Sequence, residues 1–342
     1  MPPKIFITGI TGYIGGSVFH ALSRRHPEYQ ITAFVRTTPR NFANLYPDVT
    51  LIHGTWDDRE VLTAAATEAD VVIQCGSSDH LGAVVALLDG ALRKDKAKTT
   101  YYIHLSGTAV ISDYGDVDGA IYRGRSNPKV YDDLINVEEV ISRPDGVPHR
   151  HTDKIIQEYA QKHGDVLKTA IVCPPDLYGR GYGPGKQDSV YFPVFVNEVK
   201  NLGYPFYCHE GGNTRGWAHI DDLSELYTRL IEAAVNKEGE VSWGREAYFF
   251  ATTQEATQKD IATATGKVLH AKGVISSPEA ISVSEETIAP MWKELGIPNV
   301  AFYLFANNSR SKPFRAEKEL RWKPRAPTLW QEIEKEVEAC IS

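Results

Sequence analysis

Short apolar runs alternate with amphipathic stretches through the first half of this chain. Runs rich in β-branched and aromatic residues lie at 4–9, 30–36, 48–54, 70–75 and 99–106. Between several of them, apolar positions recur every three to four residues, at 13–26, 58–67 and 79–94. The first pattern predicts buried strands and the second predicts covering helices. Repeated strand–helix units predict the α/β class, a doubly wound parallel sheet with helices on both faces.

The pattern changes near residue 175. A further helix is predicted over 148–163, with an apolar stripe that includes Ile155, Ile156 and Tyr159, followed by a strand at 167–173. Beyond it, helices are expected near 189–202, 220–235 and 328–340, separated by irregular segments. We therefore expect residues 1–175 to form the sheet domain. Residues 176–342 are expected to form mainly a smaller α/β lobe that binds the substrate, with segments that return to the sheet.

Composition and charge narrow the classes of partner. The chain has 342 residues, 42% of them hydrophobic, and a net charge of −7 without a basic cluster, which argues against nucleic acid. No apolar run is long enough to cross a membrane, and the start of the chain leaves no room for a signal peptide. Four separated cysteines form no CxxC pair, so neither a metal site nor a disulfide framework is expected. These features predict a cytoplasmic protein with a small-molecule substrate.

A glycine-rich turn joins the first predicted strand to the first helix. Its glycines follow the pattern GxxGxxG, in the context of a first strand–helix junction that makes such a triplet informative. Glycines permit a sharp turn and let the backbone approach a pyrophosphate at the helix N-terminus. The turn predicts a dinucleotide-binding Rossmann domain, in which the cofactor contacts come from Gly9, Thr11, Gly12, Tyr13, Ile14 and Gly15.

The end of the second strand bears on the choice of cofactor. An acidic residue at this place would bind the ribose hydroxyl of NAD, and an arginine would accept the extra phosphate of NADP. The chain has Arg36 and Arg40 here and no acid before Asp48, so NADP is favoured over NAD; the alternative is that both arginines are solvated loop charges. After the third strand, Asp57 and Asp58 are candidates for an adenine contact and equally suit a helix N-terminus.

Several motifs together resemble the extended short-chain dehydrogenase/reductase superfamily, of the NAD-dependent epimerase/dehydratase type. They span nearly the whole chain and read TGITGYIG, GTWDD, DVVIQC, HLSG, PPDLYGRG, RGWAHIDDL and AEKELRWKP. The resemblance implies a nicotinamide cofactor and a catalytic trio of Ser or Thr, Tyr and Lys, with the last two spaced YxxxK on a helix. It also implies a homodimer, formed through the helices near 79–94 and 148–163.

The catalytic positions depart from that pattern. Lys154 matches the lysine that holds the nicotinamide ribose, but Arg150 stands four residues earlier, where tyrosine is expected. Arginine stays protonated and cannot act as the general acid. It would instead stabilise a developing enolate or pair with a carboxylate, and the alternative is a surface charge. Gly107 aligns with the catalytic hydroxyl, which leaves Ser106 and Thr108 beside it as substitutes and Ser106 as a cofactor contact.

Three other side chains are candidates. Tyr178 follows the sixth strand, where carboxyl-end loops line the ligand crevice, and is a substitute phenolic donor or a packed loop tyrosine. His149 and His151 titrate near neutral pH, but their spacing lets only one of them face a pocket. The only YxxxK match, from Tyr182 to Lys186, contains Gly-Pro-Gly and cannot form a helix.

The leading functional prediction is an NADP-dependent oxidoreductase that reduces a carbonyl or a conjugated double bond of a small, fairly apolar molecule. An enone is favoured over a simple ketone, because it depends less on a proton donor at the oxygen. Two alternatives remain open. One is an epimerase, dehydratase or isomerase that retains its cofactor, and the other is a non-catalytic regulator that senses NADP.

Overall fold

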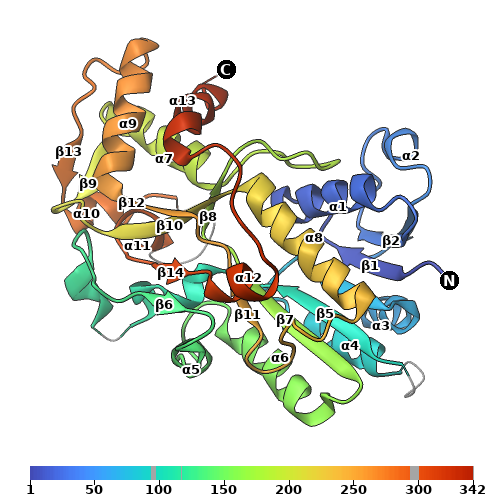
Figure 1. Cartoon of the computed structure of the whole chain (residues 1–342). Helices are drawn as coiled ribbons and strands as arrows, with labels where there is room; N and C mark the ends of the chain where they lie inside the picture. Colours follow the sequence, from blue (N-terminus) through green and yellow to red (C-terminus); the bar gives the residue numbers. More distant parts are fainter. Residues whose placement is uncertain (94–97, 117, 293–299, 342) are drawn as a thin grey trace.

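The centre of the molecule is a parallel sheet of seven strands (Figure 1). The computed structural model describes residues 1–93, 98–116, 118–292 and 300–341. Pairing is parallel throughout this sheet, which confirms the predicted doubly wound parallel architecture. In spatial order its strands are β11 (Tyr248–Phe250), β7 (Leu167–Cys173), β5 (Thr100–Leu105), β4 (Val71–Gln74), β1 (Lys4–Thr8), β2 (Gln30–Val35) and β3 (Thr50–His53).

Burial along the strands follows from their place in the sheet. Every residue of β4 and β5 is buried, because these central strands are covered on both faces, whereas the edge strand β3 is partly exposed. The burial includes His104 in β5, whose pKa is lowered by desolvation to about 3. This imidazole is therefore neutral at physiological pH.

Helices cover both faces of the sheet. On one face, α1 (Tyr13–Arg25) and α8 (Ile220–Asn236) share an apolar core with the strands. The helices on the other face are α3 (Arg59–Glu68), α4 (Leu81–Arg93), α5 (Val137–Ile141) and α6 (Arg150–His163). The chain thus returns to the sheet domain after residue 176, through α8 and through β11, which pairs with β7.

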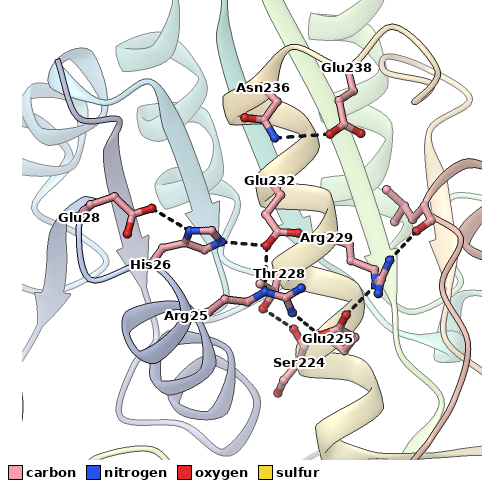
Figure 2. Close-up of polar contacts among 11 residues, drawn as sticks. Arg25, His26, Glu28, Ser224, Glu225, Thr228, Arg229, Glu232, Asn236 and Glu238 are labelled. Carbon is pink, nitrogen blue, oxygen red and sulfur yellow. Dashed lines mark hydrogen bonds and ion pairs between the residues drawn. The ribbon is translucent and has the colours of Figure 1, made fainter.

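A network of ion pairs joins α1 to α8 (Figure 2). The Arg25 guanidinium contacts Glu225 at 2.6 Å and Glu232 at 2.9 Å. His26 bridges the Glu232 carboxylate at 2.8 Å and the Glu28 carboxylate at 2.9 Å. Partly exposed pairs contribute little singly, so the network mainly orients a joint that the apolar core stabilises.

The rest of the chain forms a second lobe with its own apolar core. Its small sheets are β12-β10-β8 and β13-β9, and β6 pairs with β14. The strands are β6 (Tyr131–Asp132), β8 (Asp176–Tyr178), β9 (Phe206–Cys208), β10 (Thr214–His219), β12 (Gln254–Thr257), β13 (Ile281–Val283) and β14 (Ser311–Lys312). The main helices are α7 (Tyr191–Leu202), α9 (Gln258–Ala271) and α13 (Leu329–Ala339), which cluster at the upper left of Figure 1.

Short helical turns complete the structure. They are α2 (Phe42–Leu45), α10 (Glu285–Ile288), α11 (Val300–Phe305), α12 (Phe314–Glu319) and the 3-10 turns η1 (Thr108–Ile111), η2 (Asp113–Gly115) and η3 (Gly119–Tyr122). Asp113 in η2 is buried and accepts hydrogen bonds from the side chains of Asn127, Asn307 and Asn308, which fastens the segment after β5 to the second lobe. No helix in the described part of the chain combines the length and the hydropathy needed to span a bilayer.

Candidate active site

The glycine turn is shaped by close backbone contacts. Gly9 has a φ of +79°, and a Cβ on it would lie 2.2 Å from the carbonyl oxygen of Cys75. A Cβ on Gly15 would lie 2.4 Å from the carbonyl oxygen of Gly9. Both positions therefore require glycine for the fold itself, because a side chain would overlap the backbone of β1 or of the loop after β4.

Gly12 differs from its neighbours. It precedes α1 in an extended conformation that any residue adopts, and a Cβ on it would meet only the Gly9 oxygen, at 3.3 Å. No side chain caps α1, and no acidic residue lies in its first turn. The N-terminus of α1 thus combines open space with the positive end of the helix dipole, which fits a pyrophosphate held by the backbone N–H groups of Tyr13, Ile14 and Gly15. The N–H of Gly12 instead donates to the Gly9 carbonyl at 2.9 Å.

A loop from the second lobe crosses this turn. The backbone N–H of Lys186 donates to the Thr11 carbonyl at 2.9 Å, and the buried Tyr13 hydroxyl donates to the Gly179 carbonyl at 2.5 Å. A Cβ on Gly183 would lie 2.4 Å from Cα of Gly16, so glycine is needed for this approach. The segment from Tyr182 to Lys186 forms no helix, which confirms the prediction that this YxxxK match does not lie on a helix.

The residues predicted to set the cofactor preference lie at the carboxyl ends of β2 and β3. Arg36 is exposed and forms no ion pair with any other described residue. The Asp57 side chain is 90% exposed and lies 3.4 Å from Nε2 of His80. The Asp58 carboxylate accepts a hydrogen bond from the backbone N–H of Thr55. Asp58, rather than Asp57, therefore stabilises the turn that precedes α3. Both Arg36 and Asp57 remain accessible to a ligand at this edge.

A cavity of about 350 Å³ begins beside the glycine turn. Its walls come from both lobes and are mostly apolar or aromatic, and they include Tyr13, Ile14, Ala109, Tyr114, Pro148, Pro175, Leu177, Val190, Tyr191, Trp292, Val300, Tyr303 and Leu304. Among the described residues, two carboxylates, of Asp79 and Asp176, and the imidazole of His149 also line it. The Asp176 carboxylate is already engaged by the buried guanidinium of Arg215. The cavity therefore suits a small apolar molecule, with Asp79 and His149 as its reactive polar groups.

Asp79 and His149 form a hydrogen-bonded pair. Nδ1 of His149 lies 3.0 Å from both carboxylate oxygens of Asp79, which belongs to the loop between β4 and α4. Burial alone would lower the pKa of His149, but the hydrogen bond and charge of Asp79 outweigh it and raise the pKa above its ordinary value. The same contact holds the pKa of Asp79 below its ordinary value, despite burial. The two shifts thus favour the ionised state of the pair, in which His149 is an imidazolium and Asp79 is a carboxylate.

The family follows from the sequence comparisons. Residues 5–243 match the profile of the NAD dependent epimerase/dehydratase family, which is more than half of the chain. The chain belongs to this family. Among its relatives, Oxidase ucsJ from Acremonium sp. is 31% identical, over 98% of this chain and 96% of that protein. A dTDP-glucose 4,6-dehydratase of Mycobacterium tuberculosis is 22% identical, over 67% of this chain and 69% of that protein.

Solved structures of the epimerase/dehydratase family share the fold. The dTDP-glucose 4,6-dehydratase of Bacillus anthracis, in complex with NAD, matches with a TM-score of 0.64 at 16% identity, over 98% of this chain and 96% of that one. The UDP-glucose 4-epimerase of Thermotoga maritima, with UDP-glucose, also gives 0.64, at 15% identity over 98% and 97% of the two chains. Together with the fold and the glycine turn, these matches confirm the resemblance drawn from the sequence.

Lys154, predicted to be the family's lysine, and Arg150, predicted to stand in place of its tyrosine, do not line the cavity. The Lys154 ammonium is 44% exposed and pairs with Asp145 at 2.8 Å on the outer surface of α6. The Arg150 guanidinium is buried, where it donates to the Gln157 side chain at 2.8 Å and to the Arg143 carbonyl at 3.1 Å. The geometry therefore gives no support to their predicted catalytic roles, or to Lys154 as a cofactor contact.

The hydroxyl candidates are also occupied by structural contacts. The Tyr178 hydroxyl donates to the Pro327 carbonyl at 2.9 Å and accepts from Gln254 at 2.7 Å, outside the cavity. These contacts agree with the second of the two interpretations of Tyr178, a packed loop tyrosine. The Ser106 hydroxyl donates to Asp153 at 3.0 Å. Thr108 is buried and hydrogen-bonds Tyr303, which does line the cavity, so Thr108 acts at most through that tyrosine.

Sequence reasoning missed Asp79 and gave His149 too little weight. Asp79 follows the carboxyl end of β4, the edge of a parallel sheet where ligands bind, and this position was the available signal. Of the aromatic residues after residue 181, Tyr191, Trp292 and Tyr303 line the cavity, whereas Phe192, Phe206 and Trp217 are fully buried in the second core.

Proposed function

We propose that this chain is an NAD(P)-dependent oxidoreductase that acts on a small, mostly apolar molecule. The observation that carries the proposal is the apolar cavity, which starts at Tyr13 and Ile14 of the glycine turn and contains the Asp79–His149 pair. A bound nicotinamide cofactor would supply or accept a hydride. The chain's own residues would hold the pyrophosphate at the start of α1, exclude water from the cavity and orient the substrate.

Two further observations support this reading. A sugar nucleotide carries phosphates and many hydroxyl groups, whereas this cavity has few polar groups that are not already engaged. The name of the relative with 31% identity, an oxidase, is also in keeping with redox chemistry on a free substrate. The exposed Arg36 at the end of β2 supports NADP as the preferred cofactor.

The family also supports a second candidate, an epimerase or dehydratase that keeps its cofactor bound, since dehydratases and an epimerase are among the related proteins. The two candidates differ in cofactor exchange. A reductase binds and releases the nucleotide in each turnover, whereas a retained cofactor stays bound to the protein during purification.

The four cysteines form no disulfide among the described residues, which supports the cytoplasm as the proposed location.

The experiment begins with the purified chain. Denaturation and chromatography show whether a nucleotide was retained, and calorimetry gives the affinities for NADPH and NADH. Oxidation of NADPH is then followed with ketones, enones and quinones of increasing size. We expect exchangeable NADPH and turnover with an apolar carbonyl compound. A stoichiometric retained NAD and no turnover would favour the epimerase or dehydratase, and NADPH binding without any turnover would favour a regulator.

A further inference from the structure

The absence of a side chain at Gly107 leaves space for the side chain of His149. Gly107 follows β5 and is extended, with φ −170°, so its backbone does not require glycine. A Cβ on Gly107 would lie 3.1 Å from Nε2 of His149, a tight contact even before a hydroxyl is added. The missing side chain at Gly107 thus makes room for the imidazole ring. The two departures from the family pattern, at the hydroxyl and at the tyrosine, are parts of one arrangement.

The imidazole is held from two sides. Its Nδ1 is bound by Asp79, and the backbone of His149 has the left-handed φ of +65° that starts α6. The His149 carbonyl accepts the Thr152 hydroxyl at 2.9 Å, which fixes this first turn. Because Nδ1 faces the carboxylate, Nε2 is the nitrogen left for a ligand, and no described residue hydrogen-bonds it. His149 lines the cavity, and its Nε2 lies beside Gly107.

His149, the residue that precedes α6, lines the cavity, and Asp153 lies one turn further along. Arg150 is instead buried against Gln157, and Lys154 pairs with Asp145 at the surface. Asp153 is fully buried, and one of its oxygens accepts hydrogen bonds from Ser106 and from Tyr248. The residues of interest therefore keep a four-residue spacing, HxxxD, shifted by one position from the alignment with YxxxK. One residue turns a helix by about 100°, enough to point a side chain away from the cavity.

We propose that His149, oriented by Asp79, transfers the proton at the substrate oxygen in this chain. The assignment rests on the proposed function. In the reductive direction a bound reduced nicotinamide would supply the hydride to the carbonyl carbon, and Nε2 of His149 would give its proton to the carbonyl oxygen. The imidazolium becomes neutral imidazole and regains its proton from solvent. In the oxidative direction neutral Nε2 accepts the alcohol proton, so charge and protons balance both ways.

Four groups set the charge around this imidazole. Asp79 lies on the loop after β4, Asp153 is one turn along α6, His151 approaches Asp79, and His104 lies on β5. The two carboxylates raise the pKa of His149, and His104 is neutral. A raised pKa extends the range of pH over which the donor is protonated, so reduction should be lost as pH rises through the pKa of His149. Asp79→Asn should lower that pKa and move the loss to lower pH.

The test compares His149→Gln with His163→Gln, a matched control at the other end of α6. Benzylideneacetone is the probe, a small apolar ketone with a conjugated double bond. We expect His149→Gln to bind NADPH with parental affinity and to lose turnover by about 100-fold or more, and the control to lose neither. Parental turnover by His149→Gln would overturn the assignment. Absent turnover by the parent across the whole panel would instead overturn the proposed function.

A second variant separates proton transfer from a structural role. Asp79→Asn keeps the imidazole, and the titration of His149 can be followed directly by NMR of its side-chain nitrogens, without cofactor or substrate. The midpoint of this titration and the alkaline limb of kcat/KM should move to lower pH together. A titration that moves while the limb stays at its parental pH would show that another group supplies the proton.

Discussion

Replacing Gly12 by valine separates cofactor binding from folding more sharply than any other change in the glycine turn. The Cβ would meet only the Gly9 oxygen, at 3.3 Å, and the extended backbone accepts any residue. Loss of the favourable glycine at the N-terminus of α1 costs about 1 kcal/mol, which lowers Tm by only about 1–2 °C in a chain of 342 residues. The valine side chain would nevertheless fill the space that a pyrophosphate needs beside the helix N-terminus.

We therefore expect the NADPH affinity of Gly12→Val to fall more than about tenfold, or about 1.4 kcal/mol, with little change in Tm. Gly15→Ala is the contrasting variant, because its Cβ would lie 2.4 Å from the Gly9 oxygen and would lower stability by about 1–3 kcal/mol. Gly239→Val is the control, since a Cβ there has no neighbour within 4 Å. Calorimetry and thermal unfolding measure both quantities. Parental NADPH affinity in Gly12→Val would refute the assignment of the glycine turn.

Three further predictions concern other parts of the chain. Arg36→Asp should weaken NADPH and spare or improve NADH in calorimetry, because it exchanges a phosphate partner for a ribose-hydroxyl acceptor; equal effects on the two would make Arg36 a solvated charge. Lys154→Ala should change turnover and stability little, within about 0.5 kcal/mol, since its pair with Asp145 is exposed, and a large loss of turnover would restore its predicted role. Light scattering should show a dimer formed through α4 and α6, and a 38 kDa particle would contradict it.

The regular elements of the sheet domain could be predicted because their signals are local. The run TYYIHL and the predicted helix over 148–163 correspond closely to β5 (Thr100–Leu105) and α6 (Arg150–His163). The glycine turn was equally readable, since the need for glycine at Gly9 and Gly15 arises at a strand–helix junction that the pattern itself identifies. Even in the second lobe, α13 (Leu329–Ala339) lies within the predicted range.

Helix α6 shows why the candidate site was harder to predict. Its apolar stripe correctly placed Ile156 in the core, and Ile155 and Tyr159 pack against that core while partly exposed. The buried face, however, also carries Thr152 and Asp153. Buried polar residues are stable only when partners satisfy them, and the partners of Asp153 are Ser106 and Tyr248, far away in the sequence. The spacing of apolar residues along the chain gives no information about partners that are distant in the sequence.

The sequence by itself thus determined the strand and helix pattern, the doubly wound fold and the place of the dinucleotide turn, because each depends on residues within a few positions of one another. Only the tertiary structure decided which face of α6 turns inward, and that decision separates Lys154 on the surface from His149 at the cavity. It also brought Asp79 within 3.0 Å of His149 across 70 residues of chain. The physical reason is that packing and long-range hydrogen bonds fix a helix's rotation, and a rotation of about 100° per residue exchanges one set of side chains for the next.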